Sequence, residues 1–324
     1  MTAAVLAKLL AMFVTVALGY VAARRQWLGK PGEGDPARIL GNLAFYLFVP
    51  ALLFRTTARL DLAHMPWRTL AAFFVPALVL LFGVYLQQRH RAATDGAAAP
   101  SVRAITATFG NSVQVGIPFA AALFGEAGLA IHVTLVSLHA LVLLSVLTML
   151  VELDLARARH LHAEPAALMQ TLATTARNTV IHPVVLPVVA GLLWNTTGLG
   201  IHPIVDEGLT TLASAVVPVC LVLIGVTLAA YGVRGRVRGA LWLSALKLLL
   251  MPALVLLVAK FVFGLEGLPL HVIVVMASLP AGSNALIFAQ RYETLQAETT
   301  AAIVLSTVAF AATASLWLAL LRFV

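Results

Sequence analysis

The chain has 324 residues, of which 61% are hydrophobic and only 10% are charged, whereas a soluble domain carries about 25% charged residues. This composition excludes an ordinary soluble globular protein and predicts a polytopic membrane protein. The net charge of +8 does not indicate nucleic-acid binding, because the basic residues lie in short loops between apolar segments, where membrane topology explains them. A single cysteine, Cys220, cannot build a disulfide framework or a cysteine-based zinc site.

Apolar segments long enough to cross a bilayer follow one another along the whole chain. We predict ten membrane-spanning helices, called spans 1 to 10, over residues 4–23, 38–55, 68–86, 102–122, 128–152, 178–196, 204–230, 239–263, 269–290 and 298–321. The first run leads into RRQW without a small-residue cleavage site, so we interpret it as a span and not as a signal peptide. The predicted fold class is therefore all-α, a ten-helix polytopic membrane protein.

The distribution of lysine and arginine predicts the orientation in the cell or inner membrane, because cytoplasmic loops are enriched in both. The loops after the odd-numbered spans carry most of them: Arg24, Arg25, Lys30, Arg38, Arg89, Arg91, Arg103, Arg157, Arg159, Arg177, Arg234, Arg236, Arg238 and Arg291. These loops should be cytoplasmic, which places both termini on the extracytoplasmic side. The opposite side holds chiefly Arg55, Arg59, Arg68 and Arg322, and the group from Arg55 to Arg68 is an exception to the rule.

The order of the segments predicts an internal 5+5 repeat. Pro50 in span 2 matches Pro218 in span 7, and Pro76 in span 3 matches Pro252 in span 8. An odd number of spans in each half makes the two halves insert upside down relative to each other. The predicted parts are a first five-helix repeat at 1–152, a cytoplasmic linker at 153–177 and a second, inverted repeat at 178–324.

The fourth span of each half contains residues that interrupt a helix. Span 4 holds GNSVQVGIP (110–118) and span 9 holds LPAGSNA (279–285). Backbone groups in lipid must be satisfied within the protein, so an unwound stretch belongs against other protein or at a watery cavity. Broken spans at matching positions of inverted halves indicate a transporter binding site near the midplane. We therefore expect the two segments to cross, and the N-terminal ends of their half-helices to favour an anion.

The candidate substrate-binding residues are the polar and helix-interrupting ones of these segments together with two polar residues elsewhere in the membrane. They are Asn111, Gln114, Gly116, Pro118, Pro280, Gly282, Ser283 and Asn284, with Lys247 and His139. The amides and hydroxyls would bind a carboxylate, and the prolines and glycines would hold the helices open. The alternative is that prolines and glycines kink packed helices while Asn and Ser join neighbouring helices.

Lys247 and His139 each allow two interpretations. A lysine inside span 8 is costly, so Lys247 could offset the charge of an anionic substrate or tether a mobile part. It could also extend along the apolar surface to the interface. His139 in span 5 could be a proton site, because histidine titrates near neutral pH, or a core residue with its hydrogen bonds satisfied.

No span interior contains Asp or Glu, which argues against a carboxylate-built cation site and against an aspartyl protease. The chain has no HExxH, GxSxG or GxxxxGK[ST] motif, so an enzymatic function has no residues to support it. We predict no metal site and no cofactor, with H⁺ or Na⁺ left open as the coupling ion.

Several motifs resemble those of the auxin efflux carrier family of secondary transporters, in its short bacterial form. This family is part of the bile acid/auxin/arsenite transporter superfamily. The resemblance runs from about Ala11 to Phe310. Its motifs are NLAFYLFVPALLF, FGNSVQVGIPFAAALFGEAGL, PVVLPVVAGLLW, PVCLVLIGVTLA, LPAGSNALIFAQRYE and AAIVLSTVAF.

The resemblance implies a 5+5 inverted repeat like that of bile-acid sodium symporters. Spans 1, 2, 6 and 7 would form a scaffold with a homodimer contact through spans 2 and 7, and spans 3–5 and 8–10 would move as a transport domain, in an elevator arrangement. Spans 4 and 9 would cross at Pro118 and Pro280. The family's asparagine in span 4 would correspond to Asn111, which we favour, or to the nearby Gln114. The two crossing points match only approximately, because Pro118 aligns with Ala285 when the flanking segments are superimposed.

The predicted function is secondary active transport of a small organic anion, such as an auxin-, malonate- or malate-like carboxylate, by alternating access. A sodium-coupled symporter of bile-acid-like anions is the first alternative, and it would require a sodium gradient. A sensor that binds its ligand without moving it and a channel that conducts without saturation are the others. No nucleic acid is expected as a partner.

Overall fold

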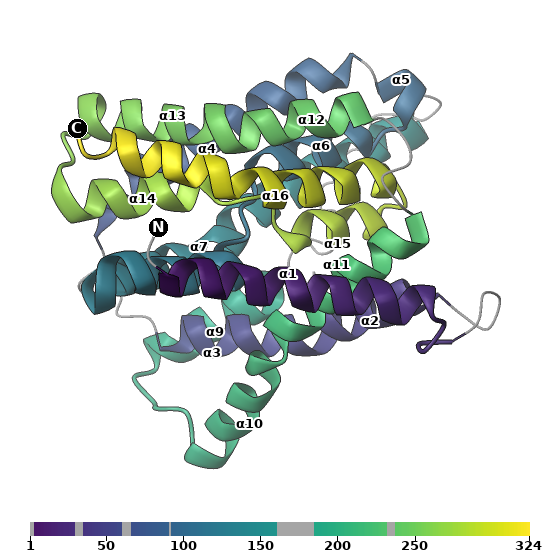
Figure 1. Cartoon of the computed structure of the whole chain (residues 1–324), viewed down its shortest axis with the longest axis horizontal. Coiled ribbons are helices and arrows are strands. Elements are labelled where there is room, and N and C mark those ends of the chain that lie inside the picture. Colours follow the sequence, from purple (N-terminus) through teal and green to yellow (C-terminus); the bar gives the residue numbers. More distant parts are fainter. Residues whose placement is uncertain (1–2, 30–34, 60–65, 91, 161–184, 232–236) are drawn as a thin grey trace.

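The computed structural model describes residues 3–29, 35–59, 66–90, 92–160, 185–231 and 237–324. Every regular element in this part of the chain is a helix (Figure 1). Its only strand-like pairing is an isolated antiparallel bridge between Gly110 and Ala281. The predicted all-α fold class is confirmed.

The helices follow the predicted spans, several of them divided into shorter elements. The first half contains α1 (Ala3–Arg24), α2 (Pro36–Leu43), the π-helix η1 (Ala44–Phe48), α3 (Val49–Ala58), α4 (Trp67–Arg89), α5 (Ala92–Asp95), α6 (Ala99–Thr108), the π-helix η2 (Ser112–Gly116) and α7 (Ile117–His160). The second half contains α9 (Val185–Thr196), α10 (Pro203–Ser214), α11 (Val216–Tyr231), α12 (Val237–Ala245), η3 (Leu246–Leu250), α13 (Met251–Leu257), η4 (Val258–Val262), α14 (Gly267–Ser278), α15 (Ser283–Arg291) and α16 (Gln296–Leu320).

Five helical stretches among the described residues are long and apolar enough to cross a membrane, and a sixth counts if the 54° bend within α16 is accepted as one span. The five are Pro36–Ala58, Trp67–Arg89, Ala122–Ala158, Pro203–Val226 and Val237–Val262. Spans 4 and 9 are missing from this count because each is interrupted. Spans 1 and 6 are missing because only part of each belongs to the described residues that were counted. The chain is thus a polytopic membrane protein, and the number ten stays a prediction.

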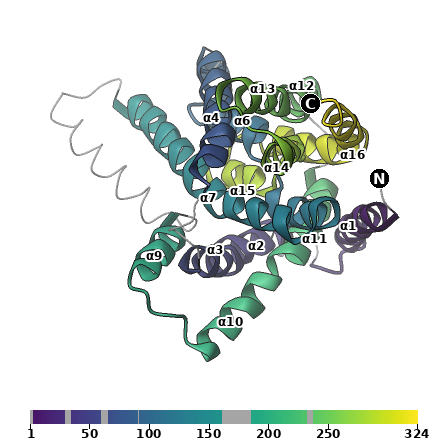
Figure 2. The same ribbon diagram turned by 90° about the vertical axis from the view of Figure 1, so that its left-hand side faces the viewer.

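The helices pack as two groups. In the first group, α1 packs against α11, α3 packs against α9 and α10, and α2 packs against α11. In the second group, α4 packs against α6, α12 against α16, and α14 against both α13 and α7. Figures 1 and 2 show the first group below the second, with α7 running between them.

Glycines bring the backbones of the first group into direct contact. A Cβ at Gly225 in α11 would overlap the Val16 carbonyl of α1, and a Cβ at Gly191 in α9 would overlap the Thr57 hydroxyl of α3. Small residues at helix crossings are typical of packing within membranes, where close van der Waals contact replaces the hydrophobic effect.

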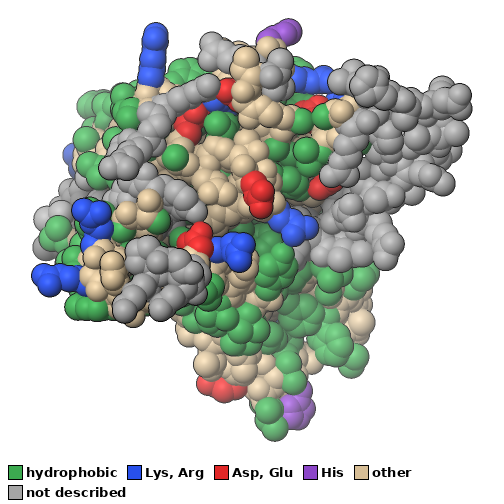
Figure 3. Space-filling model, turned by 90° about the vertical axis from the view of Figure 1, so that its right-hand side faces the viewer, with side chains coloured by type: hydrophobic (Ala, Val, Ile, Leu, Met, Phe, Trp, Pro, Cys, Tyr) green, Lys and Arg blue, Asp and Glu red, His purple; other side chains and the backbone are tan. Residues whose placement is uncertain are grey.

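Charged side chains gather at the end of the molecule where α1 ends and α2 begins (Figure 3). Helices α1, α4 and α15 all finish on an arginine, namely Arg24, Arg89 and Arg291. A cation near a helix C-terminus interacts favourably with the helix dipole. Exposed apolar side chains, such as Leu18 of α1 and Val79 of α4, cover the flanks of these two helices, as expected of a surface in contact with lipid.

A buried ion network at this end joins the four helices α4, α5, α6 and α16. The Arg103 guanidinium donates two hydrogen bonds to the Glu298 carboxylate, at 2.8 and 3.2 Å, and one to the Gln88 side-chain oxygen at 3.2 Å. It also lies 2.8 Å from an Asp95 carboxylate oxygen. Buried charges persist only when they are paired in this way. The network therefore fixes the start of α6 against α4 and α16.

Two tyrosines near this network form hydrogen bonds with carboxylates of α7. The Tyr85 hydroxyl donates to Asp154 at 2.7 Å and the Tyr292 hydroxyl donates to Glu152 at 3.1 Å. Burial and the adjacent carboxylate of Glu152 raise the pKa of Tyr292, so its hydroxyl stays a donor at physiological pH.

Helix α7 crosses two predicted boundaries. Gly125 adopts φ 62° and ψ −158°, a conformation that favours glycine, and it separates the end of span 4 from span 5. The helix then continues to His160, so residues 153–160 of the predicted linker are helical. The rest of that linker lies outside the described residues.

Candidate functional site

Two interrupted helices, α6–η2 and α14–α15, cross at their interruptions. The Asn111 amide N–H donates to the Pro280 carbonyl at 2.8 Å, and the Gly282 amide N–H donates to the Phe109 carbonyl at 2.8 Å. These bonds pair backbone groups that would otherwise be unsatisfied inside the membrane. The two segments expected to face each other do so.

The second interruption is also held from a neighbouring helix. The Ala281 amide N–H donates to the Ser306 hydroxyl of α16 at 3.0 Å, which gives a role to the serine of the STVAF motif. Gly282 is required by space, because a Cβ there would lie 2.8 Å from the Gly110 carbonyl oxygen. Only glycine lets the two backbones approach this closely.

The interruption of span 4 lies within the predicted segment 110–118, but the crossing point is at its first residue and not at its proline. The crossing involves Gly110 opposite Ala281, whereas we expected Pro118. Pro118 follows the π-helix η2 directly, inside a helical stretch that begins at Ser112 and continues into α7. A proline there does not mark the point where the helix is interrupted. Pro280 does lie in its interruption and supplies a carbonyl acceptor. The side chains of Gln114 and Pro118 lie outside the described part of the structure.

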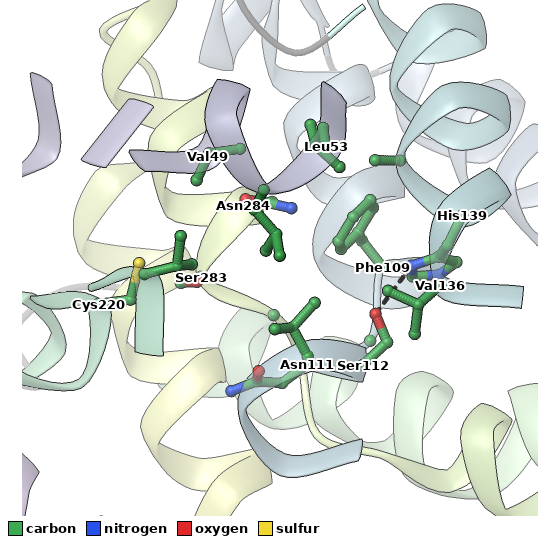
Figure 4. Close-up of a pocket in the computed structure, with 16 residues that line it drawn as sticks. Val49, Leu53, Phe109, Asn111, Ser112, Val136, His139, Cys220, Ser283 and Asn284 are labelled. Carbon is green, nitrogen blue, oxygen red and sulfur yellow. Dashed lines mark hydrogen bonds between the residues drawn. The ribbon is translucent and has the colours of Figure 1, made fainter. Parts of the chain in front are cut away.

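A pocket of about 50 Å³ opens at the crossing. Five polar side chains line it: Asn111, Ser112, His139, Ser283 and Asn284 (Figure 4). Because one water needs about 10–15 Å³ of such space, the pocket holds a few waters or a small carboxylate. The predicted residues Asn111, Gly282, Ser283, Asn284 and His139 are thus brought together in one cavity.

The opposite wall of the pocket is apolar and comes from the first helix group. Val49 and Leu53 of α3 face the crossing from one side, and Val216 and Cys220 of α11 face it from another. The pocket therefore lies between the two groups. The polar wall belongs to the second group and the apolar wall to the first.

The N-terminal end of α15 opens at this pocket. Ser283 is its first residue, and the N-cap residue Gly282 provides no side-chain cap. The first turn of a helix leaves its amides without helical acceptors and carries partial positive charge. Together with the neutral amides and hydroxyls, this end suits a negatively charged group.

Two histidines of α7 hold Ser112, the residue after Asn111. Nδ1 of His139 lies 3.4 Å from the Ser112 hydroxyl, and Nε2 of His132 donates to the Ser112 carbonyl at 2.8 Å. The sequence analysis missed His132. The spacing of seven residues, which puts both histidines on one face of a helix, was the available signal.

Gly116 has a spatial role. A Cβ at this position would lie 2.6 Å from His132 Nε2 and 2.7 Å from a Leu279 methyl carbon. Gly116 does not line the pocket. It lets His132 reach the η2 backbone, which differs from the predicted contact with substrate.

Lys247 lies behind the crossing. Its side chain is 1% exposed, so it does not extend to the membrane interface. Its Nζ donates to the Ala277 carbonyl at 2.5 Å, in the last turn of α14, where a cation favours the negative end of the helix. A Cβ on Gly110 would lie 3.5 Å from Nζ, so only the Gly110 backbone separates the lysine from the pocket.

Among the described residues, no group of three or more His, Cys, Asp or Glu side chains could hold a metal ion. The described pocket lining includes no Asp or Glu. The arrangement offers neutral donors, a helix N-terminus and a nearby lysine, which together can bind an anion through hydrogen bonds.

Comparison with known families fits this geometry. The sequence profile of the family described as "Membrane transport protein" matches residues 4–318. The chain belongs to this family, the auxin efflux carrier family. It is therefore a multi-pass membrane transporter and not an enzyme, as predicted.

Two relatives cover most of the chain. A Methanothermobacter thermautotrophicus protein named "Uncharacterized transporter" is 27% identical over 286 residues, which is 86% of this chain and 86% of the relative. A Rhizobium meliloti protein named "Putative malonate transporter" is 25% identical over 328 residues, which is 97% of this chain and 94% of the relative.

Proposed function

We propose that this transporter moves a small organic anion, of the malonate-like carboxylate class, by alternating access. The observation that carries the proposal is the pocket at the crossing, lined by amide, hydroxyl and imidazole groups at the N-terminal end of α15. The name of the Rhizobium relative supports the choice of a dicarboxylate.

In this proposal the carboxylate accepts hydrogen bonds from the second helix group. Asn111 and Asn284 donate through their amides, and Ser283 donates through its hydroxyl and its helix end. Gln114, whose side chain lies outside the described part of the structure, would be a further amide donor. Lys247 adds a positive charge from behind Gly110, at a distance where about 1–3 kcal/mol of attraction is expected for an effective dielectric constant near 20.

We further propose that ten spans form the 5+5 inverted repeat, with spans 1, 2, 6 and 7 as scaffold and spans 3–5 and 8–10 as the moving transport domain. The glycine crossings support it, since α1–α11 joins span 1 to span 7 while α3–α9 joins span 2 to span 6. In a 5+5 repeat span 1 corresponds to span 6 and span 2 to span 7. The contact between spans 1 and 7 therefore corresponds to the contact between spans 6 and 2.

Alternating access then follows from the place of the pocket between the groups. Movement of the polar wall past the apolar wall would carry the anion across. The Arg291 guanidinium of α15 donates to the Tyr46 hydroxyl of η1 at 3.2 Å. This contact joins the two groups at the arginine-rich end and has to break during such a movement.

The proposed orientation keeps that end cytoplasmic and both termini extracytoplasmic. The Arg55–Arg68 exception is partly neutralised, because Arg55 and Arg59 contact the Asp206 carboxylate at 2.9 and 2.7 Å. We also propose a homodimer through spans 2 and 7. The mass of the protein in its detergent complex, after the bound detergent is subtracted, tests the dimer.

The thermal stability of the purified protein with a panel of acids, each with and without Na⁺, tests the function. The panel contains malonate, malate, succinate, lactate, indole-acetate and taurocholate. A ligand at a hundredfold excess over its Kd adds about 2.7 kcal/mol of stability, and we expect a small carboxylate to do so in wild type but not in Asn111→Ala. A shift that needs Na⁺ would favour the sodium symporter. No shift with any acid up to millimolar concentration would contradict the proposal.

A further inference from the structure

His139 is a buried titratable residue that reaches the candidate pocket. Its side chain is 1% exposed, and its ring packs 4.2 Å from the Phe109 ring and 5.8 Å from the Phe73 ring, centroid to centroid. Its Nδ1 faces the Ser112 hydroxyl at 3.4 Å (Figure 4). Both His139 and Ser112 line the pocket, so a bound ligand would contact this pair.

The titratable residues nearest His139 within the membrane are basic and cannot supply a negative charge. Lys247 of η3 approaches from behind Gly110, and His132 lies seven residues earlier on α7. Cys220 of α11 is the titratable side chain on the opposite wall, and no carboxylate belongs to the described lining. An imidazolium at His139 therefore has no counter-charge in the pocket until an anion enters it.

An anion would supply that counter-charge. An opposite charge within a few ångströms favours the charged form of a titratable group. By linkage, if the anion favours the protonated histidine, the protonated histidine favours the anion by the same factor. The coupling is strong in a site without bulk water, where charge interactions are less screened.

We propose that His139 takes up one proton from solvent when a carboxylate binds, so that the anion and the proton are carried together. This inference rests on the proposed function. In the empty pocket the Ser112 hydroxyl donates to Nδ1 of the neutral imidazole. After protonation the Nδ1–H donates to the Ser112 oxygen, and the hydroxyl hydrogen turns to a carboxylate oxygen. No covalent bond of the substrate forms or breaks.

The test is the Kd of malonate for the purified full chain between about pH 6.5 and 8.5, above the usual range of carboxyl groups. We expect wild-type Kd to fall by up to about tenfold per unit of decreasing pH, the limit for uptake of one proton. His139→Gln should bind with a pH-independent Kd. The matched control is His132→Gln, on the same helix face, which can still donate to Ser112 and should keep the pH slope.

A second measurement does not depend on the variants. Malonate added to weakly buffered wild-type protein near the middle of this range should remove protons from solution, up to one per bound anion, and a pH indicator dye reports this. A flat wild-type Kd, no proton uptake on binding, or a pH slope that persists in His139→Gln would overturn the inference. Failure of wild type to bind any carboxylate would overturn the proposed function instead.

Discussion

Replacing Gly282 by alanine tests the crossing itself. The added Cβ would lie 2.8 Å from the Gly110 carbonyl oxygen and 3.1 Å from a Phe109 ring carbon. The nearest obstacle is backbone, so no flexible side chain can move aside. To reach an ordinary contact distance, the two chains have to separate by about 0.6 Å, which is overpacking of the kind that costs about 1–3 kcal/mol.

That separation acts on the two backbone bonds of the crossing, both 2.8 Å long. Lengthened by about 0.6 Å they leave the normal range of hydrogen bonds, and each buried bond contributes about 0.5–1.5 kcal/mol. We expect a total loss of about 2–4 kcal/mol for Gly282→Ala, because the two effects overlap. For a chain of this size the melting temperature should fall by about 3–6 °C.

Gly110→Ala is the matched control, since it alters the other glycine at the crossing. Its added Cβ would meet nothing closer than 3.5 Å, an ordinary contact. Thermal unfolding in detergent, followed by size-exclusion fluorescence, compares the two variants with wild type. Equal melting temperatures for Gly282→Ala and wild type, or an equal loss in Gly110→Ala, would refute the reasoning.

Three further changes have expected outcomes. Gly116→Ala should displace the His132 ring from the η2 backbone. The loss of this one positioning hydrogen bond should weaken malonate binding by about tenfold. Unchanged affinity in a binding titration would contradict this role of Gly116. Lys247→Met should fold, because it removes a buried charge, yet bind malonate about tenfold to a hundredfold more weakly; undiminished affinity would exclude the electrostatic role. Tyr46→Phe removes the hydroxyl that accepts the hydrogen bond from Arg291. It should change the rate of malonate uptake into proteoliposomes and leave the Kd of malonate within about twofold of wild type. An altered Kd would show that this contact affects more than the movement between the two helix groups.

The sequence predicted the existence of the helices well because each depends on a long apolar run. The ends of α4 and α16 lie within a few residues of predicted spans 3 and 10. Spans 2 and 8 were also found, but the π-helices η1 and η3 before Pro50 and Pro252 were not. Both π-turns come shortly before a proline, which cannot donate a backbone hydrogen bond. A hydropathy pattern does not show how the neighbouring backbone bonds rearrange.

The interruption of span 4 shows that residue types alone do not locate a break in a helix. Pro118 looked like the breaking residue, yet it lies inside a helical stretch that begins at Ser112 and continues from η2 into α7. The break falls at Gly110 because a second backbone, at Ala281, supplies the hydrogen bonds that the helix gives up. Such a break depends on a partner 171 residues away in sequence, which no local pattern can identify.

The candidate site was predicted in part for similar reasons. Asn111, Ser283 and Asn284 lie in the pocket because they belong to the interrupted segments that pack against each other. Lys247 was correctly marked as unusual, but its direction toward the C-terminal end of α14 depends on tertiary packing. His132 looked like a single polar residue in an apolar helix, and only its contact with Ser112 distinguishes it.

Uptake of labelled malonate into proteoliposomes tests the central claim most directly, because it requires both binding at the crossing and movement across the membrane. Wild type should show saturable uptake that unlabelled malonate competes, and Asn111→Ala should lose most of it while keeping the wild-type melting temperature. Full uptake by a stable Asn111→Ala variant, or wild-type uptake no greater than in protein-free liposomes, would contradict the account.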